Sequence, residues 1–228
     1  MKVEEAAGAF LIAAPLWFNV TFALLGKRFE YPDILRRPTD EILDRFLAGG
    51  SSLILLWWAF MLSGLLLIAA AVLLGQSLGL SDIVPLAVTI GVLAGLVQTL
   101  GLLRWVYLVP SLARAHADAS AGPAQKEANL AVFRAMHQYL GVGVGEHLGY
   151  LLTGIWTVLT GIAIVGRTLL PTWMGWVGIV IGVGLIIGSA EFLGPNEEHG
   201  WGLAGAAIPF LYIAWSLWLL VMGVALIV

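Results

Sequence analysis

The sequence contains no cysteine at any of its 228 positions, which excludes disulfide bonds, thiolate metal sites and cysteine nucleophiles. Charged residues are scarce as well: they make up 11% of the chain, against about 25% in an average soluble domain. The net charge of −3 gives no indication of nucleic-acid binding. The HExxH, P-loop and GxSxG motifs are also absent, so the sequence favours a role other than that of an enzyme.

Apolar residues dominate the chain. They make up 60% of it, and the mean hydropathy is +0.96, which indicates residence in a lipid bilayer. Six apolar segments reach about the 20 residues that a helix needs to cross the hydrocarbon core. Because backbone polar groups in lipid must be paired within the spanning segment, we expect an all-α polytopic membrane bundle. It would form one transmembrane domain, with spans at about residues 7–25, 52–74, 83–106, 140–165, 172–192 and 204–227.

The N-terminal segment is expected to enter the first span rather than to act as a cleaved signal. Its first eight residues, MKVEEAAG, carry one Lys against two Glu, which makes a poor signal-peptide start. The apolar run from Ala6 to Leu25 also exceeds the roughly 7–15 residues of a signal-peptide core.

The most charged stretch is Lys27–Gly50, between the first two apolar segments. After Pro38, an acidic first turn precedes an apolar face, which predicts a short helix lying at the membrane interface. That face consists of Ile42, Leu43, Phe46 and Leu47. The segment is either a linker resting on the membrane or a gate or docking element for a partner protein.

Lys and Arg are distributed unevenly between the two ends of the predicted bundle. Two of the eleven, Lys2 and Arg167, fall at the end where the termini lie, and nine fall in or beside the first and third loops. The positive-inside rule therefore places these loops in the cytoplasm and both termini outside.

The segment Tyr139–Gly166 is long and apolar enough to span a bilayer, yet it contains Glu146 and His147. An ionisable residue within a span is costly and marks a candidate functional site. Four polar side chains fall within about 40° of Glu146 on an α-helix with about 100° per residue. They are Tyr150, Thr153, Thr157 and Thr160. In the alternative interpretation, the threonines only pack and bond carbonyl groups one turn back.

Other polar groups gather at the cytoplasmic ends of the predicted spans, and Arg104 is the expected counter-ion of Glu146. Snorkelling towards the interface is the alternative explanation for Arg104 and Glu191. We predict a pocket that opens to the cytoplasmic side and binds or transports a small or amphipathic molecule. The predicted ligand-binding residues are Glu146, Arg104, Tyr150, Thr153, Thr157, His147, Gln98 and Glu191.

Two further functions stay open. In the first, the protein is a non-catalytic membrane subunit or regulator that docks a partner through the charged first loop. In the second, it binds a metal or haem through histidines. For the second, His137 would combine with Glu146 and His147, but these residues do not share one helix face, so other helices would have to supply ligands. The sequence leaves the identity of any cofactor open.

Several GxxxG spacings occur in the predicted third and fifth spans, where they allow close approach of helix backbones. They are Gly91–Gly95, Gly178–Gly182 and Gly184–Gly188. We expect them to serve packing within the chain rather than dimerisation.

Five stretches together resemble a family of bacterial multi-pass membrane proteins grouped as a domain of unknown function. They are FEYPDILRRPTDEIL, WWAF, QTLGLLRWVYLVPSLA, MHQYLGVGVGEHLGYLLTGIW and LPTWMGWVGIVIGV. The resemblance covers nearly the whole chain and implies a helical protein of the bacterial inner (plasma) membrane. It implies no activity, substrate or site residue.

Overall fold

The computed structural model describes residues 2–79 and 81–228, and every regular element in these residues is helical. The α-helices are α1 (Val3–Phe29), α2 (Thr39–Leu78), α3 (Ile83–Leu103), α4 (Val109–Ala117), α5 (Pro123–Met136), α6 (Gly149–Val165), α7 (Thr172–Gly188) and α8 (Gly202–Ile227). Short 3-10 helices are η1 (Asp33–Arg36) and η4 (Gly194–Asn196). Two π-helical segments, η2 (Arg104–Leu108) and η3 (His137–Leu148), join α3 to α4 and α5 to α6 as continuous helices.

Five continuous helices in the described part of the chain are long and apolar enough to cross a membrane. They are Val3–Phe29, Thr39–Leu78, Ile83–Ala117, Pro123–Val165 and Gly202–Ile227. The prediction of an all-helical multi-pass membrane protein is therefore confirmed. The predicted span at residues 172–192 is shorter than expected, because the apolar helix α7 has 17 residues and ends at Gly188, and turns follow.

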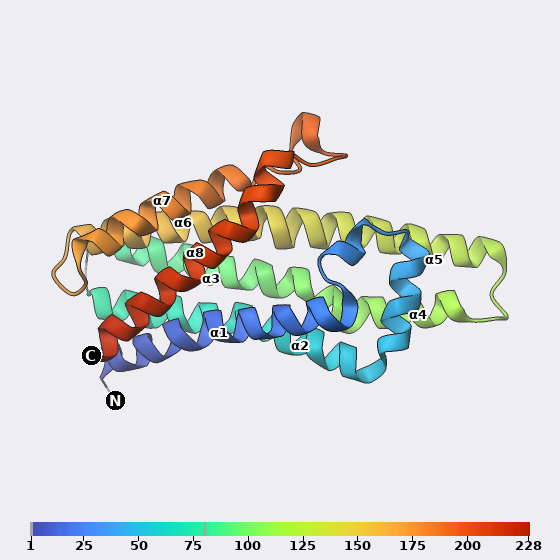
Figure 1. Cartoon of the computed structure of the whole chain (residues 1–228), viewed down its shortest axis with the longest axis horizontal. Coiled ribbons are helices and arrows are strands. Elements are labelled where there is room, and N and C mark those ends of the chain that lie inside the picture. The colour runs from blue at the N-terminus through green and yellow to red at the C-terminus, as the bar shows by residue number, and fades with distance from the viewer. Residues whose placement is uncertain (1, 80) are drawn as a thin grey trace.

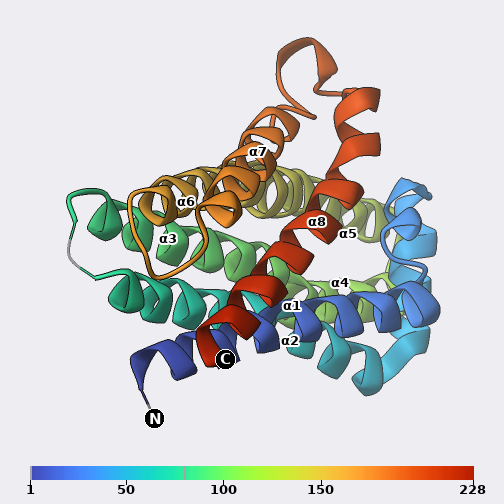
Figure 2. The ribbon, with the colours of Figure 1, turned by 60° about the vertical axis from the view of Figure 1, so that its left-hand side comes forward.

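The six long elements form a closed ring in which each contacts the next, in the order α1, α2, α3, α6, α7, α8 and back to α1. Figures 1 and 2 show α1, α2, α3 and α6 running along the long axis of the molecule, while α8 runs obliquely to them and has its C-terminal end beside the start of α1. Both termini lie at one end (Figure 1). At the opposite end lie α4, α5 and the first part of α2 (Figure 1).

Helix α2 bends at Gly50, where a positive φ of 57° interrupts the helical backbone. The part before the bend, residues 39–49, turns across the end of the bundle (Figure 1). Its predicted apolar face is mostly buried: Ile42, Leu43 and Phe46 pack into an aromatic cluster with Trp57 and Trp105. This helix therefore rests its apolar face on the bundle itself.

The glycines that were expected to pack within the chain do so. A Cβ built on Gly182 would lie 2.6 Å from the carbonyl oxygen of Gly154, and one on Gly178 would lie 2.6 Å from the Trp218 ring. On α3, a Cβ built on Gly91 would lie 2.6 Å from the Trp156 ring, and one on Gly95 would lie 2.5 Å from the carbonyl oxygen of Gly64. These contacts bring α7 against α6 and α8, and α3 against α2.

A clasp of four charged residues holds the first loop. Glu30 ends α1 with a φ of 56° and accepts hydrogen bonds from Arg37 and Arg45. Both arginines also pair with Glu41, so the clasp joins the end of α1 to the start of α2. These four charges satisfy one another, which leaves them less available for docking a partner protein.

We expect acid to release the clasp. The hydrogen bond from Arg45 and the charges of Arg37 and Arg45 hold the pKa of Glu30 below its ordinary value of 4.5. A carboxyl with a lowered pKa in the folded state contributes stability above its unfolded pKa and loses it as the pH falls through the folded pKa. Glu30→Gln should therefore lower the Tm in detergent at pH 7 and lower it by less at pH 4, below the ordinary pKa of 4.5.

The control is Asp33→Asn, which removes an acid whose pair with Arg36 is long, at 3.8 Å, and mostly exposed. It should leave the Tm unchanged at both pH values, since exposed pairs contribute little. Equal Tm values for Glu30→Gln and wild type at pH 7 would contradict a stabilising clasp.

Candidate functional site: an arginine between two π-helical segments

The two π-helical segments lie beside each other near the α4–α5 end of the bundle. Segment η3 packs along α3, and at Gly101 and Gly145 the two backbones nearly touch: a Cβ on Gly101 would lie 2.6 Å from the Cα of Gly145. Glycine weakens the α-helix, and η3 contains Gly141, Gly143 and Gly145. π-helical segments occur frequently at functional sites.

Arg104, the first residue of η2, is the charged centre of this region. Its residue surface is 6% exposed, and its Nη1 group donates a hydrogen bond to the carbonyl oxygen of Gly101. The guanidinium carbon lies 5.3 Å from the centre of the Trp105 ring, a cation–π distance. Among the described residues, its buried Nε group has no hydrogen-bond partner.

Gly141 makes room for the guanidinium. A Cβ at this position would lie 2.7 Å from Nη2 and 2.9 Å from Cζ of Arg104. Any larger residue at position 141 would therefore displace the charged group.

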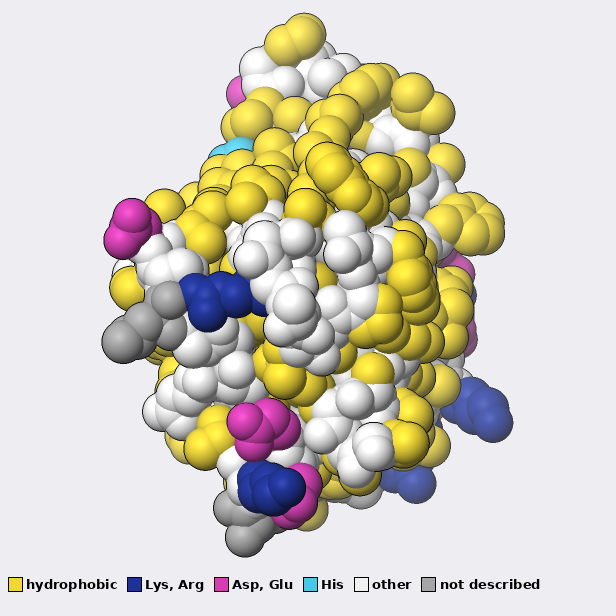
Figure 3. Space-filling view, turned by 90° about the vertical axis from the view of Figure 1, so that its left-hand side faces the viewer, with side chains coloured by type: hydrophobic (Ala, Val, Ile, Leu, Met, Phe, Trp, Pro, Cys, Tyr) yellow, Lys and Arg dark blue, Asp and Glu magenta, His cyan; other side chains and the backbone are white. Residues whose placement is uncertain are grey.

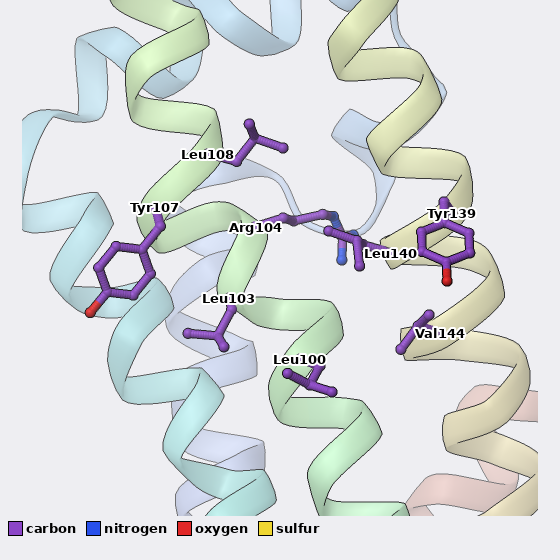
Figure 4. Close-up of a pocket in the computed structure, with 8 residues that line it drawn as sticks. All are labelled: Leu100, Leu103, Arg104, Tyr107, Leu108, Tyr139, Leu140 and Val144. Atoms are coloured by element: carbon purple, nitrogen blue, oxygen red, sulfur yellow. The ribbon is translucent and has the colours of Figure 1, made fainter.

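Arg104 lines an open groove of about 420 Å³ between the two segments (Figure 4). Its other lining residues are Leu100, Leu103, Tyr107, Leu108, Tyr139, Leu140 and Val144. Tyr107 and Tyr139 are 75% and 67% exposed, and in Figure 4 they lie on opposite sides of the opening. The groove thus combines apolar walls and two tyrosines with a single charged group.

Glu146 lies near Arg104 but is not bonded to it. The two side chains are close enough to interact electrostatically, and Glu191 also acts on Glu146. In the described part of the chain, however, Glu146 forms no ion pair within 4.0 Å. It is partly buried in η3 and does not line the groove. Because η3 is π-helical, the α-helical angles used to align Glu146 with α6 do not apply before Gly149.

The threonines and Gln98 join helices in the interior. Thr153 and Thr157 are fully buried; Thr153 accepts a hydrogen bond of 2.9 Å from Gln98 on α3, and Thr157 accepts one of 2.9 Å from Trp215 on α8. Thr157 donates to the carbonyl of Thr153 at 2.7 Å. These contacts agree with the packing interpretation.

A second cavity, of about 10 Å³, is lined by Gln98 and six other residues. That volume is about the smallest that holds one water molecule. Tyr150 contacts the ring of Tyr212, one of the lining residues, with 5.4 Å between ring centres.

Two further predicted residues, His147 and Glu191, lie near the α7–α8 connection. Nδ1 of His147 is 2.7 Å from the carbonyl oxygen of Ser189, so Nδ1 carries the proton and donates. Glu191 lies in the turns after α7, against Gly205, and burial raises its pKa. His137 stacks on Phe133, with ring centres 5.6 Å apart. Among residues 2–79 and 81–228, no three His, Asp or Glu side chains are grouped so that they could hold a metal ion.

Of the eight residues predicted to bind a ligand, only Arg104 lines this groove. Arg104 was singled out from the sequence, but no sequence pattern places Gly141 against it.

Continuous apolar helices that enclose a buried charged group define a multi-pass helical membrane protein. A family described as a domain of unknown function (DUF4386) matches residues 6–223, and the chain belongs to it. The resemblance to a domain-of-unknown-function family is thereby confirmed. Searches of curated proteins and of solved structures give no match.

Proposed function

We propose that the protein binds a small or amphipathic molecule in the plasma membrane of a bacterium, near the cytoplasmic side. One observation carries the proposal: the guanidinium of Arg104 is buried in the wall of an open groove, and no carboxylate of the described residues lies within 4.0 Å of it. Burying an unpaired charge is costly, so a protein retains one where a ligand uses it. The volume of about 420 Å³ lies in the range of small-molecule pockets.

In this proposal the bundle has six spans, with α7 as a short one, and residues 39–49 lie at the cytoplasmic interface. Nine of the eleven Lys and Arg residues belong to the end with the groove. Figure 3 views the opposite end, where the termini lie, and its surface is mostly hydrophobic or uncharged with few Lys and Arg side chains. This difference supports cytoplasmic placement of the groove by the positive-inside rule.

If the bound molecule is also transported, Glu146 is the candidate proton carrier. It interacts electrostatically with Arg104, so its protonation would change the charge that a ligand meets there. Glu146→Gln should then abolish proton-coupled uptake by vesicles while binding persists. Uptake equal to that of wild type would remove this role from Glu146.

Binding is tested by photolabelling the purified protein with tagged single-chain amphiphiles, one anionic and one zwitterionic. At least one should label residues of the groove, and Arg104→Gln should reduce this labelling by about tenfold, because a hydrogen bond to a charged group contributes about 1.5–3 kcal/mol. The matched control Arg114→Gln removes the same charge from an exposed position on α4. Absence of groove labelling by either probe would refute the proposed binding.

A further inference from the structure

We propose that the groove takes the phosphate group of an anionic phospholipid, which enters sideways from the bilayer while its acyl chains stay in the membrane. This inference rests on the proposed function and specifies its ligand. Its basis is the position and bonding of Arg104, together with the surface that leads to it.

The charge of the groove selects an anion. Arg104 is the one charged residue among the eight that line it. Its Nη1 group is engaged by Gly101, whereas its Nε group has no partner among the described residues. A guanidinium offers several N–H groups in a plane that matches the oxygens of phosphate. A phosphate group in the groove would therefore offset the buried positive charge of Arg104.

The depth of Arg104 fits a headgroup. It lies about 32 Å along the helix from Ile83, at about 1.5 Å per residue, and the hydrocarbon core is about 30 Å thick. Tyr107 and Tyr139 are exposed at the same level, where interfacial tyrosines gather. A lipid phosphate occupies this boundary without leaving its leaflet.

The groove is continuous with the lipid-facing side of α3. That side carries the exposed residues Leu86, Leu93, Leu96 and Leu100. Leu100, which is 43% exposed, also lines the groove. An acyl chain can thus lie along α3 while the headgroup of the same lipid reaches Arg104, which favours a bilayer lipid over an anion from the aqueous phase.

The charge of Glu146 offers a second test of whether the groove prefers an anionic lipid. It interacts electrostatically with Arg104 but does not line the groove, so it opposes a bound anion without touching it. Glu146→Gln should therefore increase the preference for anionic lipid, whereas Arg104→Gln should remove it.

The experiment places a photocrosslinking amino acid at Tyr139, on the groove rim, or at Trp176, an exposed residue of α7. Each protein is reconstituted in nanodiscs of equal phosphatidylglycerol and phosphatidylcholine, and the crosslinked lipids are counted by mass spectrometry. At Tyr139 we expect about tenfold enrichment of phosphatidylglycerol, by the strength of one charged hydrogen bond. At Trp176 we expect none. Arg104→Gln should abolish the enrichment at Tyr139, and Arg114→Gln should preserve it.

Should Arg104→Gln fail to fold, Arg104→Lys keeps the charge but loses the planar donor fork, and it should reduce the enrichment several-fold. Equal crosslinking of both lipids at Tyr139 in the wild type overturns the inference. It leaves the proposed function standing if single-chain amphiphiles still label the groove in a manner that depends on Arg104. Competition by millimolar inorganic phosphate would assign the site to a soluble anion and also overturn it. No labelling by any lipid or amphiphile defeats both proposals.

Discussion

Gly154→Leu should destabilise the protein more than any other single substitution considered for this chain. A Cβ at position 154 would lie 2.7 Å from the carbonyl oxygen of Gly182 and 2.9 Å from the backbone nitrogen of Ile186. Both obstacles are backbone atoms of α7, so no change of side-chain rotamer relieves the clash. The two helices would have to separate along their contact, which includes a second close pair at Gly161 and Gly175.

Overpacking a well-packed interior costs about 1–3 kcal/mol, and this case belongs at the upper limit because the whole helix must move. For a chain of this size we expect the Tm to fall by roughly 6–12 °C. Thermal unfolding in detergent, followed by tryptophan fluorescence, measures the change. Gly202→Leu is the matched control, since a Cβ there meets nothing within 4 Å. A Tm within about 2 °C of wild type for Gly154→Leu would mean that α6 and α7 do not approach this closely.

The helices could be predicted from the sequence because a single segment that crosses a bilayer must pair its backbone polar groups internally, as an α-helix does. Apolar runs such as residues 52–74 and 204–227 are long enough to cross, and unpaired backbone groups in lipid force them to be helical. The span predicted at residues 172–192 was too long, because hydropathy alone does not reveal that the helix ends at Gly188.

The candidate site was only partly predictable. Arg104 and Glu146 stood out because charge within an apolar run is costly. Arg104 was expected to be the counter-ion of Glu146, and the two interact electrostatically, but among the described residues they form no ion pair within 4.0 Å. An α-helical projection fails across η3, where the backbone is π-helical. The hydroxyl groups of Thr153 and Thr157 look like a polar stripe in the sequence. In the structure they accept hydrogen bonds from residues on α3 and α8, and the sequence does not predict these partners.

The groove depends on one glycine, and its replacement should separate binding from stability. Gly141→Val would place a Cβ 2.7 Å from Nη2 of Arg104, so the guanidinium must leave its position beside η3. The obstacle is the end of a flexible side chain, and the fold can survive its movement. We expect a loss of about tenfold in labelling of the groove by amphiphiles, equal to that of Arg104→Gln.

Gly143→Val is the matched control, because a Cβ at position 143 lies 3.6 Å from the nearest atom, the carbonyl oxygen of Gln138. Both substitutions put the same β-branched residue into the same π-helical segment, so they share any general effect on η3. If the groove is defined by the space that Gly141 gives to Arg104, labelling falls with Gly141→Val and persists with Gly143→Val. Equal loss in both variants would trace the effect to the backbone of η3 instead, and labelling retained in both would remove Arg104 from the binding of the ligand.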